Sequence, residues 1–193
     1  MKSVCVFCGS NVGSDPAYIT AAQELGKVLA EKEISLVYGA GNVGLMGVIA
    51  DACLEKDGHV IGVIPHFLMA KEVGHNGVSE LIKTDTMHER KQIMADRSDG
   101  FISMPGGMGT MDEMCEILTW AQLGLHSCPV GVLNVKGYFD SLLNFFDEMV
   151  EKRFLHQKNR DMIISHEDPY ELLRLMDAYQ PPDVEKWIDR AQV

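Results

Sequence analysis

The segment 105–113, with the sequence PGGMGTMDE, holds the residues best suited to bind a phosphate group. It follows an apolar run and precedes a helical pattern, so it joins a strand to a helix. Gly106, Gly107 and Gly109 expose backbone N–H groups because they lack a Cβ, and Thr110 adds a hydroxyl. The helix behind the loop is partially positive at its N-terminus. We therefore expect these four residues to bind phosphate. The Gly-Lys-Ser/Thr ending of a nucleoside triphosphatase P-loop is missing from the segment.

Glu113 places a carboxylate in the first turn of that predicted helix, close to the expected phosphate site. A carboxylate at this position faces the same ligand-bearing end of the helix, so it is a candidate functional group. The spacing also fits a capping box, with Thr110 at the N-cap and Glu113 at the third helical position. The spacing alone does not decide between these roles, which are compatible with each other.

Two more glycine-rich turns follow predicted strands, Gly9-Ser10 and Gly39-Ala40-Gly41. Ligands of parallel α/β sheets bind beyond the carboxyl ends of the strands, so we expect all three turns to line one crevice. The stretch 39–44 is a GxGxxG, the dinucleotide-binding pattern. However, it follows the second strand, and the acidic residue expected after the next strand is missing. We therefore favour a mononucleotide over NAD or FAD.

Alternating strand and helix patterns run along the whole chain. They predict a single-domain α/β fold over residues 1–193, Rossmann-like and doubly wound, with helices on both faces of a parallel sheet and a peripheral tail from about residue 180. Asp15 is the expected N-cap of the first helix, with proline at its first position. The predicted strands are 4–8, 34–38, 59–64, 80–84, 100–104, 130–134 and 162–165. The predicted helices are 16–32, 45–56, 87–97, 110–124, 138–153 and 170–178, with a short helix and loop in 67–78 and another helix around Trp187.

The composition narrows the class of partner. Lysine and arginine total 17 against 28 acidic residues, which gives a net charge of −11. This charge opposes binding to nucleic acid or to an anionic membrane, so we expect a small-molecule partner. The opening apolar run is too short for a signal-peptide core, and no run is long enough to span a bilayer. We therefore expect a cytoplasmic protein with reduced cysteines.

Neither cysteine nor histidine spacing indicates a metal or a redox centre. Cys5 and Cys8 form a CxxC on a predicted strand, where residues three apart face opposite sides of the sheet. A zinc site needs a second pair of ligands, and the seven histidines include no HxxxH pair. We expect neither a metal nor a cofactor.

Several of these motifs together resemble the LOG-type cytokinin riboside 5′-monophosphate phosphoribohydrolases, a family long mislabelled as lysine decarboxylases. PGGMGTMDE matches the PGGxGTxxE signature of that family, and the stretch 87–91, MHERK, matches its MHxRK element. The turns at 8–10 and 39–46 and the stretch TWAQLG at 119–124 also fit. The resemblance extends from near residue 1 to beyond Asn134. Met108 stands at a variable position where an aromatic residue is common, so it is a candidate determinant of base preference.

The resemblance implies hydrolysis of the base–ribose bond of AMP-type nucleotides by a homodimer. It implies a catalytic pair, Arg90 and Glu113, with Met87 and Lys91 contacting the substrate. Residues 90 and 91 lie about 100° apart around a helix, so only one of them can point squarely at the ligand. The alternative for this Arg-Lys pair is a solvated helix face. The alternative function is a non-catalytic nucleotide or molybdenum-cofactor carrier.

Overall fold

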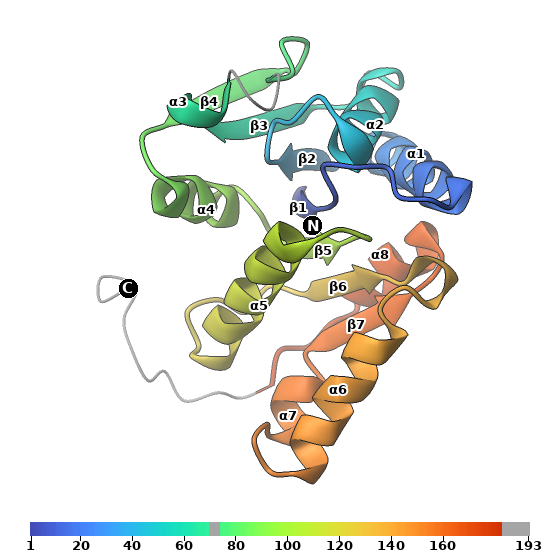
Figure 1. Cartoon of the computed structure of the whole chain (residues 1–193), viewed down its shortest axis with the longest axis vertical. Helices are drawn as coiled ribbons and strands as arrows, with labels where there is room; N and C mark the ends of the chain where they lie inside the picture. The colour runs from blue at the N-terminus through green and yellow to red at the C-terminus, as the bar shows by residue number, and fades with distance from the viewer. Residues whose placement is uncertain (70–73, 183–193) are drawn as a thin grey trace.

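The computed structural model describes residues 1–69 and 74–182, in which seven parallel strands form one sheet in the order β4-β3-β2-β1-β5-β6-β7 (Figure 1). This confirms the predicted strands and the parallel doubly wound sheet. Consecutive strands run outward from β1 toward one edge, and β5 then pairs with the other side of β1. The strands are β1 (Ser3–Phe7), β2 (Ser35–Tyr38), β3 (Val60–Pro65), β4 (Glu80–Thr84), β5 (Phe101–Ser103), β6 (Val130–Leu133) and β7 (Ile163–His166).

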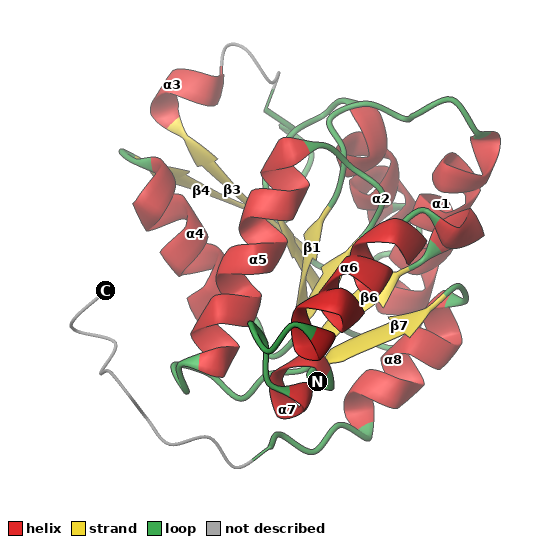
Figure 2. Cartoon of the chain, turned by 60° about the horizontal axis from the view of Figure 1, so that its bottom comes forward, coloured by secondary structure: helices red, strands yellow, loops and turns green. Residues whose placement is uncertain are grey.

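Helices cover both faces of the sheet (Figures 1 and 2). One face carries α1 (Pro16–Glu31), α2 (Gly44–Leu54) and α8 (Pro169–Asp177). The other carries α4 (Met87–Asp96), α5 (Met108–Gln122) and α6 (Asp140–Glu151). Short helices lie at α3 (His66–Met69), α7 (Gln157–Arg160) and the 3-10 turn η1 (Val135–Gly137). Within the described ranges, no helix has the length and apolar character needed to cross a bilayer.

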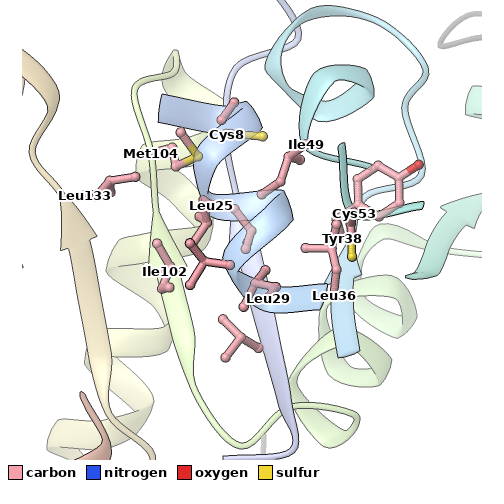
Figure 3. Close-up of a cluster of buried hydrophobic side chains, with 14 of the residues drawn as sticks. Cys8, Leu25, Leu29, Leu36, Tyr38, Ile49, Cys53, Ile102, Met104 and Leu133 are labelled. Carbon is pink, nitrogen blue, oxygen red and sulfur yellow. The ribbon is translucent and has the colours of Figure 1, made fainter. Parts of the chain in front are cut away.

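The core on the α1 face is a cluster of buried hydrophobic side chains. Leu25 and Leu29 of α1 and Ile49 of α2 lie against Leu36 and Ile102 of the sheet, and all five side chains are fully buried (Figure 3). Burial of such side chains contributes roughly 1.5–3 kcal/mol each. Helices α1 and α2 and the central strands therefore form a well-packed base for the loops at the carboxyl ends of the strands.

Side-chain caps fix where two helices begin. The Asp15 carboxylate accepts a hydrogen bond from the Ala17 N–H at 2.8 Å, which confirms the predicted cap of α1. At α4, the Thr86 hydroxyl accepts from the Glu89 N–H at 3.1 Å, and the Glu89 carboxylate accepts from the Asp85 N–H at 2.8 Å. These bonds satisfy N–H groups that the helix itself leaves unpaired, so the start of α4 is well defined.

The predicted capping box at α5 is wrong. The helix begins at Met108 with Gly107 as its N-cap, so Thr110 is the third helical residue and Glu113 lies in the second turn. No side chain caps this helix start, so Glu113 does not act as the predicted capping residue. The sequence patterns also missed α7 and η1, because elements of three or four residues show no periodicity. The helix expected around Trp187 lies outside the described residues.

Candidate active site

Two glycine turns meet at the point where the chain order of the sheet reverses, beyond β1 and β5. The Gly9 N–H donates to the Pro105 carbonyl oxygen at 3.0 Å, which joins the turn after β1 to the loop after β5. Beside this contact lies a cavity of about 290 Å³, which we call the Arg90–Glu113 cavity. It is lined by Cys8, Gly9, Ser10, Met46, Leu68, Met87, Arg90, Gly107, Met108, Gly109, Thr110, Asp112 and Glu113.

The Arg90 guanidinium is buried and held in place by backbone carbonyls. Its Nε donates to the Val63 carbonyl oxygen at 3.1 Å, and its Nη2 donates to the Gly39 carbonyl oxygen at 3.1 Å. Its Nη1 lies 3.9 Å from the Met87 sulfur. Only 6% of the residue is exposed, so the alternative of a solvated helix face is wrong for Arg90. A guanidinium has five N–H donors, and the two carbonyls engage only part of this set.

Glu113 lies half-buried on α5 and lines the same cavity as Arg90. Its charge acts on the neighbouring Cys8, which also lines the cavity. Burial raises the pKa of the Cys8 thiol far above its ordinary value, and the Glu113 carboxylate raises this pKa further. Cys5 faces the opposite side of the sheet, as predicted for a CxxC on a strand. The cavity therefore contains a fixed cation, a carboxylate and a neutral thiol.

The glycine loop forms one wall of this cavity. A Cβ on Gly106 would collide with the Thr110 hydroxyl oxygen and would lie 2.8 Å from the Gly9 nitrogen, so this position requires glycine. Gly107 and Gly109 are exposed, and a Cβ at either of them would meet no atom within 4 Å. The first turn of α5 thus presents unpaired backbone N–H groups to the cavity, a geometry suited to a phosphate.

Gly39 and Gly41 lie behind the residues that line the cavity. A Cβ on Gly39 would collide with the Arg90 guanidinium, so this glycine makes room for the buried cation. A Cβ on Gly41 would lie 2.6 Å from the methyl carbon of Met46, which does line the cavity. The structure thus gives these two glycines a supporting position instead of direct access to the cavity.

The N-terminus of α2, which follows the GxGxxG stretch, is covered by protein. The Leu45 N–H donates to the Gly9 carbonyl oxygen at 3.0 Å. A Cβ on Gly44 would collide with the backbone of Ser10, so the turn after β1 packs directly on this helix end. In dinucleotide-binding folds the pyrophosphate sits at the equivalent helix end. The packing therefore favours a mononucleotide at the neighbouring, open end of α5.

Lys91 lies next to Arg90 in sequence but points elsewhere. Its Nζ is 3.0 Å from a Glu116 carboxylate oxygen and 3.3 Å from an Asp112 carboxylate oxygen, so it links α4 to α5. Burial lowers the pKa of Lys91, but the two carboxylates outweigh burial and leave the pKa raised. Arg90 and Lys91 thus project in different directions, as their angular separation requires. Glu116 is engaged by this lysine.

A second cavity of about 280 Å³ lies on the other side of the glycine loop, and we call it the tyrosine cavity. It shares Gly9, Ser10 and Gly107 with the Arg90–Glu113 cavity. Tyr18 and Tyr138 line it, and their rings meet edge-on with centroids 5.8 Å apart. The sequence patterns gave no sign of Tyr138 at this loop, because 32 residues separate it from Gly106.

Comparisons with known proteins agree with these motifs. Residues 46–176 match a family model described as "Possible lysine decarboxylase". The chain is 48% identical over 180 residues to the probable cytokinin riboside 5′-monophosphate phosphoribohydrolase LOGL6 of Oryza sativa subsp. japonica, covering 93% of this chain and 72% of that protein. It is 47% identical over 180 residues to the cytokinin riboside 5′-monophosphate phosphoribohydrolase LOG7 of Arabidopsis thaliana, covering 93% of this chain and 83% of that protein.

Solved structures of similar shape are more distant in sequence. The molybdenum cofactor carrier protein of Chlamydomonas reinhardtii has a TM-score of 0.70 at 20% identity, over 92% of this chain and 98% of that one. The molybdenum cofactor binding protein of Rippkaea orientalis has a TM-score of 0.68 at 20% identity, over 92% of this chain and 97% of that one. At this identity the likeness establishes the fold alone. The sequence relatives are much closer, and the chain belongs to the family of cytokinin riboside 5′-monophosphate phosphoribohydrolases, which the family model describes as possible lysine decarboxylases.

Proposed function

We propose that this chain binds a nucleoside 5′-monophosphate of the AMP type and hydrolyses the bond between its base and its ribose. The products are the free base and ribose 5-phosphate. One observation carries this proposal: Arg90 and Glu113 line a single cavity, and the wall of that cavity is the glycine loop at the N-terminus of α5. One site can thus bind the phosphate and place the ribose beside the Glu113 carboxylate.

The 5′-phosphate contributes binding energy only, and water does not attack its phosphorus. Backbone N–H groups of Gly106, Gly107, Gly109 and Thr110 are our candidate donors to it, with Gly9 and Ser10 at the adjoining turn. The protein carries a net charge of −11, so its overall field does not attract an anion. Local amide dipoles must therefore hold the phosphate, and that binding energy fixes the reacting bond in place.

Glu113 is our candidate for the group that activates water. As the C1′–N bond breaks, its electron pair leaves with the base, which takes up a proton, and positive charge develops on the ribose. The carboxylate stabilises this charge and accepts a proton from the water whose oxygen bonds to C1′. No step requires a metal ion.

Arg90 is our candidate for the group that positions the substrate and the carboxylate. Its guanidinium is fixed by the Val63 and Gly39 carbonyls, so it loses little further freedom when it contacts a ligand. A positive charge beside a carboxylate also favours the ionised form that accepts a proton. Met87 lines the cavity next to Arg90, while Lys91 acts on this site only through its ion pairs with α5.

The carrier hypothesis is weaker than the hydrolase hypothesis. Its support is a fold likeness at about 20% identity, whereas relatives named as phosphoribohydrolases are 46–48% identical over 180 residues. A carrier would bind a nucleotide tightly without turnover, so a product assay separates the two hypotheses.

The experiment is an assay of base release. The protein is incubated with AMP, N6-isopentenyl-AMP and other 5′-monophosphates, and the free base is quantified by chromatography. Glu113→Gln should abolish release while the melting temperature changes little. Glu116→Gln is the matched control, because Glu116 lies one turn further along α5 and pairs with Lys91. Absence of base release by the wild-type protein, or full activity of Glu113→Gln, would refute the proposal.

We also infer a homodimer and a cytoplasmic location. The apolar stretch 111–123 supports the dimer, because it carries more apolar surface than one buried stripe requires. All five cysteines are free, which suits a reducing compartment. Light scattering at micromolar concentration tests the dimer, and a stable monomer would contradict it. Fractionation of cells expressing the protein tests the location, and recovery outside the cytoplasm would contradict it.

A further inference from the structure

The hydroxyl of Tyr138 is bound to the glycine loop from the side of the tyrosine cavity. It donates a hydrogen bond of 2.6 Å to the Gly106 carbonyl oxygen. The ring is held as well, because it meets Tyr18 and Phe139 edge-on with centroids 5.8 and 5.0 Å apart. The aromatic contacts thus fix the direction from which the hydroxyl reaches the loop.

This bond determines which way the peptide between Gly106 and Gly107 faces. In a trans peptide the C=O of one residue and the N–H of the next point in opposite directions. Because the Gly106 C=O points at Tyr138, the Gly107 N–H points away from it. Gly107 lines both cavities, so an N–H that points away from Tyr138 points toward the Arg90–Glu113 cavity. Within residues 1–69 and 74–182 this N–H donates to no acceptor.

Few other contacts could hold this peptide in position. A Cβ at Gly107 would meet no atom within 4 Å, so no side-chain contact at this residue fixes the peptide that joins it to Gly106. The Gly107 carbonyl oxygen accepts from the Met111 N–H at 3.1 Å, which holds the following peptide but not this one. If the peptide flipped, the Gly106 carbonyl oxygen would replace the Gly107 N–H on the cavity side, where it would repel a phosphate. Thr110 packs against Gly106 from inside. In the part of the chain that the structure describes, the hydrogen bond to the Gly106 carbonyl oxygen comes from the Tyr138 hydroxyl, so this hydroxyl is the group that holds the carbonyl.

We propose that Tyr138 is a positioning residue for phosphate binding, which acts by aiming the Gly107 N–H at the 5′-phosphate. This inference rests on the proposed function. A residue in this role affects binding of any ligand that carries the phosphate. It does not affect binding of the base, which lies at the other end of the substrate.

The test compares Tyr138→Phe with the wild-type protein. We expect the KM for AMP to rise about tenfold with little change in kcat, because one hydrogen bond to a charged group is lost equally in the ground and transition states. The inhibition constant of ribose 5-phosphate should rise by the same factor, and that of adenine should not change. Tyr170→Phe is the matched control, since its hydroxyl bonds to Glu31 at 2.7 Å on a remote surface and the two tyrosines are similarly exposed.

The outcomes separate this inference from the proposed function. If the wild-type protein releases no base from AMP, the proposed function fails. If the wild-type protein does release base, two results for Tyr138→Phe would overturn the positioning role. One is an unchanged KM for AMP, and the other is an inhibition constant of adenine that rises as much as that of ribose 5-phosphate. The melting temperatures of Tyr138→Phe and Tyr170→Phe are measured to detect a general loss of structure. Such a loss would weaken the binding of AMP, ribose 5-phosphate and adenine together, and it would count against the inference.

Discussion

The Nη2 of Arg90 donates a hydrogen bond to the carbonyl oxygen of Gly39, a residue 51 positions earlier in the chain, at a distance of 3.1 Å. This bond ties a helix that precedes β5 to the end of β2. It gives the first glycine of the GxGxxG stretch a role that the dinucleotide pattern does not suggest. The glycine provides an acceptor for the buried cation and, by lacking a Cβ, also leaves room for it.

Gly39→Ala should displace the Arg90 guanidinium and reduce activity. The added methyl group would collide with the guanidinium, which cannot shift without breaking its bond to the Gly39 or Val63 carbonyl. We expect a loss of at least tenfold in kcat/KM for AMP, measured by base release. Gly74→Ala is the control, because its new Cβ would lie 3.7 Å from the nearest atom of the described residues. Equal activity of both variants would contradict this account.

Arg90→Lys should lower kcat/KM by about 10²–10³-fold, the usual effect of removing one fixed donor that stabilises a transition state. A lysine cannot reproduce the fork that bonds two carbonyls at once, so the charge would no longer be held in the same place. Arg97→Lys at the C-terminal end of α4 is the control, because Arg97 forms an exposed ion pair with Glu80. A loss of similar size in that control would indicate a general effect of altering α4.

Gly106→Ala and Gly109→Ala should differ in stability. The methyl group at 106 would collide with the Thr110 hydroxyl, and overpacking of this kind typically costs about 1–3 kcal/mol. The methyl group at 109 would meet open space inside a helix, where alanine is favoured over glycine by up to about 1 kcal/mol. Urea unfolding checks both values. A Gly106→Ala protein as stable as Gly109→Ala would refute the close contact.

Alkaline pH should destabilise the fold through its buried thiols. Burial raises the pKa of Cys53 from 9.0 to about 11, so the folded protein keeps its proton at a pH where the unfolded chain has lost it. The free energy of unfolding should therefore fall as pH rises from 9 toward 11. In Cys53→Ala this decline should be shallower. Urea midpoints across this pH range give the measurement, and identical slopes would contradict the prediction.

Much of the fold could be predicted because its signals are local. Each strand is a short apolar run, and each long helix has a clear period, so all seven strands were found within a residue or two at each end. The glycine loop and Arg90 were found from motif letters. The start of α5 was placed two residues too late, because a threonine followed three residues later by a glutamate is typical of a cap. In this loop Gly107 provides the N-cap instead.

The contacts that complete the site could not be predicted, because they join distant parts of the chain. No pattern near residue 138 indicates that a tyrosine hydroxyl there holds Gly106. Likewise, the MHxRK element points to Arg90, but it does not indicate that the Gly39 and Val63 carbonyls hold this side chain or that Lys91 pairs with α5. Such contacts depend on how β-strands far apart in sequence become neighbours, and short-range spacing carries no information about that.

The anchoring of Arg90 has a consequence for how the protein acquires activity. Its guanidinium is bound to Gly39 just after β2 and to Val63 within β3, in one half of the sheet. Glu113 belongs to the helix that follows β5 in the other half. Neither half alone can assemble the pair. Turnover should therefore emerge only once both halves of the sheet have docked during refolding.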